Sequence, residues 1–312
     1  MEKRTTLKVP GILISLGAIG NVSKVNDRIV VKTPRIGGTR DEYRREKFAS
    51  EIENYDFLEA QPSLCPDIAR SFLRIPNANF LALCSGGNLF VRLQQHQLRK
   101  PDGPSGRLVE IRAREPIELV EQWIMELSSA VAWLESLTYA HTDLRPENLI
   151  FDSDDHLKLT DFDSMEKIGT RASGCAPPWA RCLGPEAGSQ RGSFGDNGAR
   201  YESFAIGSVL YFMTRGHEPY DDATFGPQIG AAKGRLLQLM LFPSLGTDAL
   251  DNIIRKCWHS DYQQLEDLAK ESKCLPGYST RPRATLLNPD IYKQTQEECR
   301  QLVANGFLKV NQ

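Results

Sequence analysis

The stretch YAHTDLRPENLIFDSDDHLKLTDFD, residues 139–163, carries the side chains that decide how this chain is interpreted. Asp143 is a carboxylate able to orient and deprotonate an attacking hydroxyl group. Asn148, five residues later, offers a neutral oxygen, and Asp161, thirteen residues beyond it, offers an anionic oxygen. Mg²⁺ prefers such oxygen ligands. The spacing therefore predicts a phosphotransferase in which Asn148 and Asp161 hold Mg²⁺ and a nucleotide lies beside a hydroxyl.

The same stretch resembles the catalytic segment of the protein kinase family. Residues 141–143 read HTD where that family has HRD, residues 144–148 read LRPEN where it has LKPEN, and residues 161–163 read DFD where it has DFG. The resemblance implies ATP as the phosphate donor and Asp143 as the catalytic base. It also implies that Arg145, in place of the family's lysine, keeps positive charge near the transferred phosphate.

The N-terminal region extends the resemblance. Residues 15–22 (SLGAIGNV) resemble the glycine-rich hairpin that covers the phosphates, with serine in place of the first glycine. Residues 29–32 (IVVK) then resemble the strand whose lysine contacts the α and β phosphates. The nucleotide-binding residues implied here are Gly17, Gly20, Val22, Val30 and Lys32.

A charged lysine in such a site needs an anionic partner. Residues 41–60 have the apolar spacing of a helix, at Phe48, Ile52, Tyr55 and Leu58. Glu51 lies on this predicted helix, nineteen residues after Lys32, and we take it as the partner. Glu53 is the competing choice, and either glutamate could instead belong to a solvated helix face.

The apolar segment Phe80–Cys84 runs into a polar stretch and resembles the kinase hinge. The resemblance implies that Leu81 lies beside the adenine and that backbone groups of Ala82 and Cys84 bind its edge. It also places Asn88 within reach of the ribose.

The C-terminal half contains further segments of the same kind. Residues 184–186 (GPE) resemble the APE that ends a kinase activation segment, and Arg281 resembles the buried arginine that pairs with its glutamate, Glu186. Residues 201–214 resemble the central buried helix, with Glu202 where aspartate is usual, and residues 253–258 resemble a later helix.

These segments predict an α+β, bilobal, protein kinase-like fold. We expect one domain over residues 1–290, with a small β-rich N-lobe over about 1–84 and a larger, mainly helical C-lobe over about 85–290. Residues 291–312 are expected to form a C-terminal tail. Two polar stretches, residues 94–116 and 263–279, are expected to be surface insertions, and the first contains a clear turn, KPDGP, at residues 100–104.

Composition agrees with one globular domain of 312 residues and 35.0 kDa. A net charge of −2 and a pI near 6.3 give no reason to expect nucleic acid as a partner, and no apolar run of membrane-spanning length is present. Seven cysteines without a CxxC pair indicate reduced thiols and a cytoplasmic or nuclear location. The sequence leaves the oligomeric state open.

Three functions remain in competition. The leading hypothesis is a Ser/Thr protein kinase with a protein substrate, because LRPEN resembles the Ser/Thr form of the loop. The second is a pseudokinase scaffold, favoured by Thr142, Asp163 and Glu202, where the family usually has other residues. The third is a small-molecule phosphotransferase of the aminoglycoside and choline type, whose loops also end in D-x-D, as residues 161–163 do.

Thr142 generates a prediction about regulation. The arginine that kinases carry at this position receives the phosphate of a phosphorylated activation segment, and threonine has neither its charge nor its fork of donors. We therefore expect a Thr170→Ala/Ser173→Ala variant to retain the phosphotransferase activity of the wild type, within about twofold. Loss of activity in this variant, with folding intact by circular dichroism, would contradict the interpretation.

Overall fold

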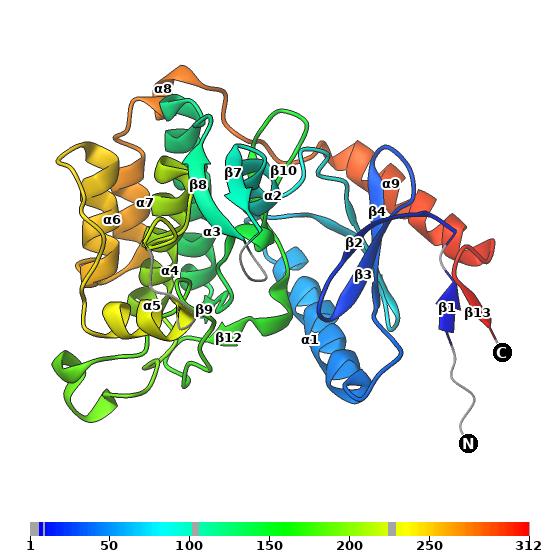
Figure 1. Ribbon diagram of the computed structural model, residues 1–312. Helices are drawn as coiled ribbons and strands as arrows, with labels where there is room; N and C mark the ends of the chain where they lie inside the picture. Colours follow the sequence, from blue (N-terminus) through cyan, green and yellow to red (C-terminus); the bar gives the residue numbers. More distant parts are fainter. Residues whose placement is uncertain (1–5, 9, 102–105, 224–228, 312) are drawn as a thin grey trace. The chain divides into compact units, whose positions relative to one another are not determined.

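The computed structural model describes residues 6–8, 10–101, 106–223 and 229–311 (Figure 1). The chain forms two compact units. The first unit contains residues 1–85, 161–164 and 285–312, and the second contains residues 86–160 and 165–284. Strands dominate the N-terminal part and helices dominate the C-terminal part, so the predicted α+β class is confirmed.

The first unit is built on a five-stranded antiparallel sheet in the order β2-β3-β4-β6-β5. Its strands are β2 (Ile12–Leu16), β3 (Gly20–Lys24), β4 (Ile29–Pro34), β5 (Ser71–Ile75) and β6 (Ala78–Ala82). Strand β4 is buried along its whole length, as its β-branched IVV run favours. In the register, Val22 lies opposite Lys32 and Val30 lies opposite Leu81.

Helix α1 (Asp41–Glu59) packs within the first unit through residues spaced at helical intervals. Its buried residues are Phe48, Glu51, Tyr55 and Leu58. The short 3₁₀ helix η2 (Phe162–Ser164) belongs to the same unit, and the rings of Tyr55 and Phe162 meet edge to face at 5.2 Å. Asn54 also donates a 2.7 Å hydrogen bond to the Phe162 carbonyl. The DFD segment is thereby fixed on α1.

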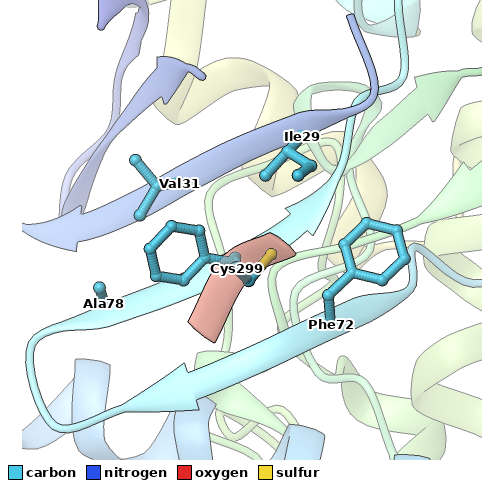
Figure 2. Close-up of a cluster of buried hydrophobic side chains, with 6 residues drawn as sticks. Ile29, Val31, Phe72, Ala78 and Cys299 are labelled. Atoms are coloured by element: carbon cyan, nitrogen blue, oxygen red, sulfur yellow. The ribbon is translucent and has the colours of Figure 1, made fainter. Parts of the chain in front are cut away.

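The C-terminal residues also belong to the first unit. Helix α9 (Pro289–Ala304) packs against β5. Strand β1 (Thr6–Lys8) pairs with β13 (Lys309–Asn311), and the two lie side by side in Figure 1. Figure 2 shows Cys299 of α9 among the buried side chains of the sheet. Residues 291–312, expected to form a C-terminal tail, belong to the same unit as the sheet, because an apolar side of α9 covers it.

The second unit is mainly helical. Helices α3 (Ile117–Ser136) and α4 (Ala199–Arg215) each bury thirteen residues and form its centre. Around them lie α2 (Leu89–Gln94), α5 (Ile229–Gln238), α6 (Ala249–His259), α7 (Leu265–Ser272) and α8 (Gly277–Thr280). Among the residues that the structure describes, no helix combines the length and apolar character needed to cross a lipid bilayer.

Short strands and 3₁₀ turns carry the loops of this unit. The hairpin of β10 (Leu149–Phe151) and β11 (Leu157–Leu159) follows the 3₁₀ turn η1 (Pro146–Asn148). The other pairs are β7 (Gln97–Lys100) with β8 (Arg107–Ile111), and β9 (Tyr139–Ala140) with β12 (Glu166–Lys167). A further 3₁₀ segment, η3, spans Pro185–Gln190.

The two predicted insertions differ in the structure. The first contains the β7–β8 hairpin, and most of the turn predicted at residues 100–104 lies outside the described residues. The second prediction is wrong, because α7 packs against α3 and buries Leu265, Leu268 and Ala269. A short amphipathic helix with many charged residues reads as polar when only its composition is considered.

The predicted ion pair between Arg281 and Glu186 is also wrong. Glu186 pairs with Arg181, at 2.5 Å, and Arg281 donates to the side-chain oxygen of Gln122 on α3. Arg181 is buried and lies only five residues before Glu186, so a local cation takes the carboxylate. Because Glu186 itself is exposed, it does not need a distant buried partner.

Close packing of α4 against α6 gives a stability prediction. A Cβ atom added to Gly207 would lie 2.7 Å from Cys257 Cβ and 3.0 Å from the Trp258 ring. Alanine normally stabilises a helix by about 1 kcal/mol relative to glycine. Here we expect Gly207→Ala to lower the free energy of unfolding by about 1–3 kcal/mol, because the overlap outweighs the propensity.

The matched control is Gly234→Ala in α5, where the added Cβ would meet only Pro177 Cγ, at 3.5 Å. This variant is expected to be stabilised by up to about 1 kcal/mol. Urea denaturation of both variants measures the two effects, and effects of the same sign would contradict the packing argument.

Candidate active site

A buried lysine between two carboxylates forms the centre of the first unit. Lys32 Nζ lies 2.6 Å from Glu51 Oε2 and 2.5 Å from Asp161 Oδ1. Burial by itself would lower the pKa of Lys32, but the charges of Asp161 and Glu51 outweigh it and the pKa is raised. Burial also raises the pKa of Glu51 to about 7 against the effect of Lys32. The ammonium of Lys32 therefore stays charged. Glu53, the competing choice of partner, is exposed, and the partner on α1 is Glu51.

The hairpin beside Lys32 depends on its glycines. A Cβ atom on Gly20 would lie 2.8 Å from the Thr33 carbonyl and 3.2 Å from Lys32 Cγ and Cε. The Gly17 amide donates to the Gly20 carbonyl at 2.9 Å and closes the turn between β2 and β3. The absence of a side chain at Gly20 therefore leaves room for the lysine stem beneath the hairpin.

The DFD segment explains how aspartate can stand where glycine is usual. Asp163 lies in the 3₁₀ helix η2, a backbone conformation open to any residue, so glycine is not required. Its carboxylate is buried and accepts a 2.8 Å hydrogen bond from Ser164 Oγ. Burial and the nearby charge of Asp161 raise the pKa of Asp163. Lys47 Nζ lies 3.4 Å from the Asp163 carbonyl and adds positive charge at this end of the segment.

In the second unit, Asp143 has partners on both carboxylate oxygens. Asn148 Nδ2 donates to Asp143 Oδ2 at 3.0 Å and to its carbonyl at 2.9 Å. The Cys175 thiol lies 3.4 Å from Asp143 Oδ1, and burial together with Asp143 raises the pKa of Cys175 to about 11. The thiol is therefore protonated at neutral pH and acts as a donor. Arg145 makes a two-pronged ion pair with Glu147, at 2.9 and 2.7 Å.

A buried glutamate that the sequence analysis noted only as a departure supports this loop. The Glu202 carboxylate, 1% exposed at the start of α4, accepts the backbone N–H groups of His141 and Thr142 at 3.0 Å each. Thr142 has a φ of 67°, which is unfavourable for a β-branched residue, and these bonds hold it. In the sequence, the sign of this role was the position of a glutamate, Glu202, near the start of a predicted apolar helix. Cys175 gave no signal in the sequence.

The predicted hinge residues lie at the end of β6. Leu81 is buried, and the Ala82 amide donates to the carbonyl of Arg70, the residue before β5, at 2.9 Å. Cys84 follows the strand and is partly exposed. Asn88 caps helix α2, since its Oδ1 accepts from the Val91 amide at 2.8 Å. This capping bond accounts for Asn88 without a ribose, so its predicted nucleotide contact stays a prediction.

The predicted Mg²⁺ ligands have suitable chemistry. Within the described part of the chain, no three His, Cys, Asp or Glu side chains surround a common metal position. Mg²⁺ commonly uses one or two protein oxygens together with substrate phosphates, so such a cluster is not needed. Asn148 turns its amide nitrogen toward Asp143, which leaves its carbonyl oxygen for a cation. The Asp161 carboxylate, 32% exposed, has the anionic oxygen that the predicted Mg²⁺ site requires.

The fold and these two groups of residues agree with comparisons to known proteins. The model of the protein kinase domain matches residues 77–271, more than half of the chain. The chain therefore belongs to the protein kinase domain family. The match begins after Lys32 and Glu51 and includes the catalytic segment, residues 139–163.

Several curated proteins are similar over part of the chain. The cAMP-dependent protein kinase catalytic subunit 3 of Drosophila melanogaster is 38% identical over 104 residues, 32% of this chain and 17% of that protein. The serine/threonine-protein kinase Sgk1 of Rattus norvegicus is 27% identical over 176 residues, 55% of this chain and 36% of that protein. The CBL-interacting protein kinase 4 of Oryza sativa subsp. japonica is 27% identical over 165 residues, 51% and 32% of the two chains. The matched region thus spans 17% to 36% of these relatives.

The β10–β11 hairpin that follows the catalytic loop is anchored to α3 by a buried carboxylate. Glu126, fully buried, lies 2.5 Å from His156 Nδ1, and it accepts the Leu157 amide at 2.7 Å. The hydrogen bond to Glu126 raises the pKa of His156 above its usual 6.5, against the effect of burial. The folded protein therefore favours the protonated imidazole.

This pair gives a pH prediction. A raised histidine pKa adds stability that is fully present below pH 6.5 and is lost as the pH rises through the folded-state pKa. We expect the unfolding temperature to fall above about pH 6.5, and His156→Gln to flatten that slope. Thermal unfolding from about pH 6 to about pH 9 measures it, with His259→Gln at an exposed histidine as the control. An unchanged slope in His156→Gln would refute the assignment.

Proposed function

We propose that this protein is an ATP-dependent protein kinase that transfers the γ-phosphate to a Ser or Thr hydroxyl of a protein substrate. The observation that carries the proposal is Lys32 held between Glu51 and Asp161. Such an arrangement keeps the buried lysine charged and oriented, so that it can bind the phosphates of a nucleotide. The Ser/Thr preference is supported by residues 144–148 and by the names of the relatives.

In the proposed reaction, Asp143 orients the substrate hydroxyl and accepts its proton as phosphate transfer proceeds. The Asn148 amide holds one oxygen of that carboxylate, and the substrate hydroxyl would replace the Cys175 thiol at the other oxygen. Lys32 binds the α and β phosphates, and Glu51 maintains its position. Asn148 and Asp161 would hold Mg²⁺, which neutralises the charge of the phosphates when bound.

The residues around the nucleotide base are proposed from the same family pattern. Gly17 and Gly20 would cover the phosphates, Val22, Val30 and Leu81 would enclose the adenine, and backbone groups of Ala82 and Cys84 would bind its edge. Arg145 would face the transferred phosphate, and its guanidinium would then contact both the phosphate and Glu147. We place the protein in the cytoplasm or nucleus, since all seven cysteines are free thiols.

A specific observation favours a second candidate, a pseudokinase scaffold. Both oxygens of Asp143 are engaged, one of them by Cys175, so a substrate hydroxyl must displace a thiol to reach the carboxylate. A thiol is a weak hydrogen-bond donor, and a hydroxyl replaces it at low cost. We therefore favour the active enzyme over the scaffold.

The decisive variant is Asp143→Asn. Removal of the base is expected to lower the rate of phosphate transfer by about 10²–10⁴-fold, with nucleotide binding retained, since Lys32 and Asp161 are unchanged. Transfer from labelled ATP with Mg²⁺ to casein and myelin basic protein measures the rate. A thermal-shift titration with ATP and Mg²⁺ measures binding.

The matched control is Asp154→Asn, an exposed aspartate in the turn of the same segment, which should leave the rate unchanged. Nucleotide binding without transfer that depends on Asp143 would overturn the enzyme proposal in favour of a scaffold. Transfer to amino sugars or choline, with none to proteins, would instead favour the small-molecule phosphotransferase.

A further inference from the structure

Helix α9 covers the side of the sheet opposite the nucleotide-binding residues of β4. Ile29 and Val31 on this strand join an apolar cluster with Cys299 of α9, and Figure 2 shows these side chains together. Successive side chains of a strand point to opposite faces. Val30 and Lys32 therefore point the other way, and Lys32 reaches Glu51 and Asp161. One strand thus carries the proposed phosphate-binding lysine on one face and the α9 contact on the other.

The apolar contact is extensive. The cluster also contains Phe72, Ala78 and Phe80 of the two strands after α1, and each of these residues is at most 3% exposed. The last residues of the chain that pack against it are Val303, Phe307 and Leu308. Because this contact buries apolar surface, α9 is part of the hydrophobic core of the first unit.

Polar contacts fix α9 at two further points. Glu298 accepts from Asn26 Nδ2 at 2.7 Å and pairs with Arg28 at 2.8 Å, and Asn26 in turn receives the amides of Arg28 and Ile29. This network holds the turn that leads into β4. Loss of the Glu298 contact would free the start of the strand that bears Lys32.

At the other end, Tyr292 ties α9 to β5 and to helix α1. Its hydroxyl donates to the Ser71 carbonyl at 2.8 Å and lies 3.3 Å from Glu59 at the end of α1. The Arg70 guanidinium lies 4.6 Å from the Tyr292 ring centre and makes a two-pronged pair with Glu59. Helix α9 therefore contacts both the strand that carries Lys32 and the helix that carries Glu51.

We propose that α9 is a positioning element for the Lys32–Glu51 pair: it braces β4 from behind and fixes the end of α1, and so sets where the lysine ammonium lies. The inference rests on the proposed function, since the lysine is there assigned to the phosphates. The family match covers residues 77–271, so α9 lies outside the matched residues.

The test loosens α9 without removing it. The variant Tyr292→Phe/Glu298→Gln deletes one hydroxyl and one charge and keeps the apolar contact. The matched control is Glu297→Gln, the same change at the adjacent residue, which is exposed and whose carboxylate pairs with Arg300 and Gln301 of the same helix. Both proteins are used at full length.

The first readout does not require catalysis. Acylation of Lys32 by an N-hydroxysuccinimide ester, followed by mass spectrometry, reports how often the buried ammonium leaves its two carboxylates. We expect the double variant to be acylated at Lys32 about five- to tenfold faster than the wild type, as each lost hydrogen bond makes local opening several-fold more frequent. The Glu297→Gln control should match the wild type.

The second readout separates positioning from folding. We expect the KM for ATP to rise about threefold or more and kcat to fall, while the KM for the protein acceptor stays unchanged, because only the phosphate-binding lysine is displaced. Unchanged Lys32 acylation in the double variant, or an equal change in the control, would overturn the inference. If the wild type transfers no phosphate, the proposed function fails, but the acylation result still decides whether α9 positions Lys32.

Discussion

The ion pairs of Lys32 are the constraint on which the first unit depends. A buried ammonium is costly unless anions and hydrogen bonds compensate for the lost water, and removal of one partner leaves a charge stranded. The two partners come from an α-helix and from a segment 129 residues away in the sequence. Strand β4, helix α1 and the DFD segment therefore have to pack against one another in the folded unit. This requirement explains why residues 161–164 belong to the same compact unit as the sheet.

The departures from the family pattern are accommodated by local structure. Asp163 occupies a 3₁₀ turn in which glycine has no special advantage. Ser164 donates a hydrogen bond to its carboxylate, and Lys47 donates one to its carbonyl. Thr142 keeps an unfavourable φ because Glu202 accepts its amide. The backbone conformation of both loops is thus compatible with the two substituted residues. Their effect is on charge: burial, together with the charges of neighbouring carboxylates, raises the pKa of Glu51 and of Asp163.

Local patterns in the sequence predicted the main elements, and distant partners were harder to predict. Apolar residues at helical intervals predicted α1, on which Glu51 is the partner of Lys32, and the resemblance of residues 201–214 to a buried kinase helix predicted α4. The Arg281–Glu186 pair failed because the choice among several arginines depends on packing that no spacing encodes. Helix α7 was missed because its few buried residues stand among charged ones. Cys175 could not be found at all, since its contact with Asp143 exists only in three dimensions.

Helix α9 shows how a mostly polar segment can still stabilise the fold. Within the helix, Thr295 and Cys299 are the buried residues, and the apolar pattern in its sequence is therefore weak. Its contribution comes from where those few side chains dock, on the back of the strand that holds Lys32. The face of the sheet opposite Lys32 carries apolar side chains, and a cover is needed there because exposure of apolar surface to water is unfavourable. Where the cover is a helix from the same chain, its anchoring bonds become a means of adjusting the site from the opposite side of the sheet.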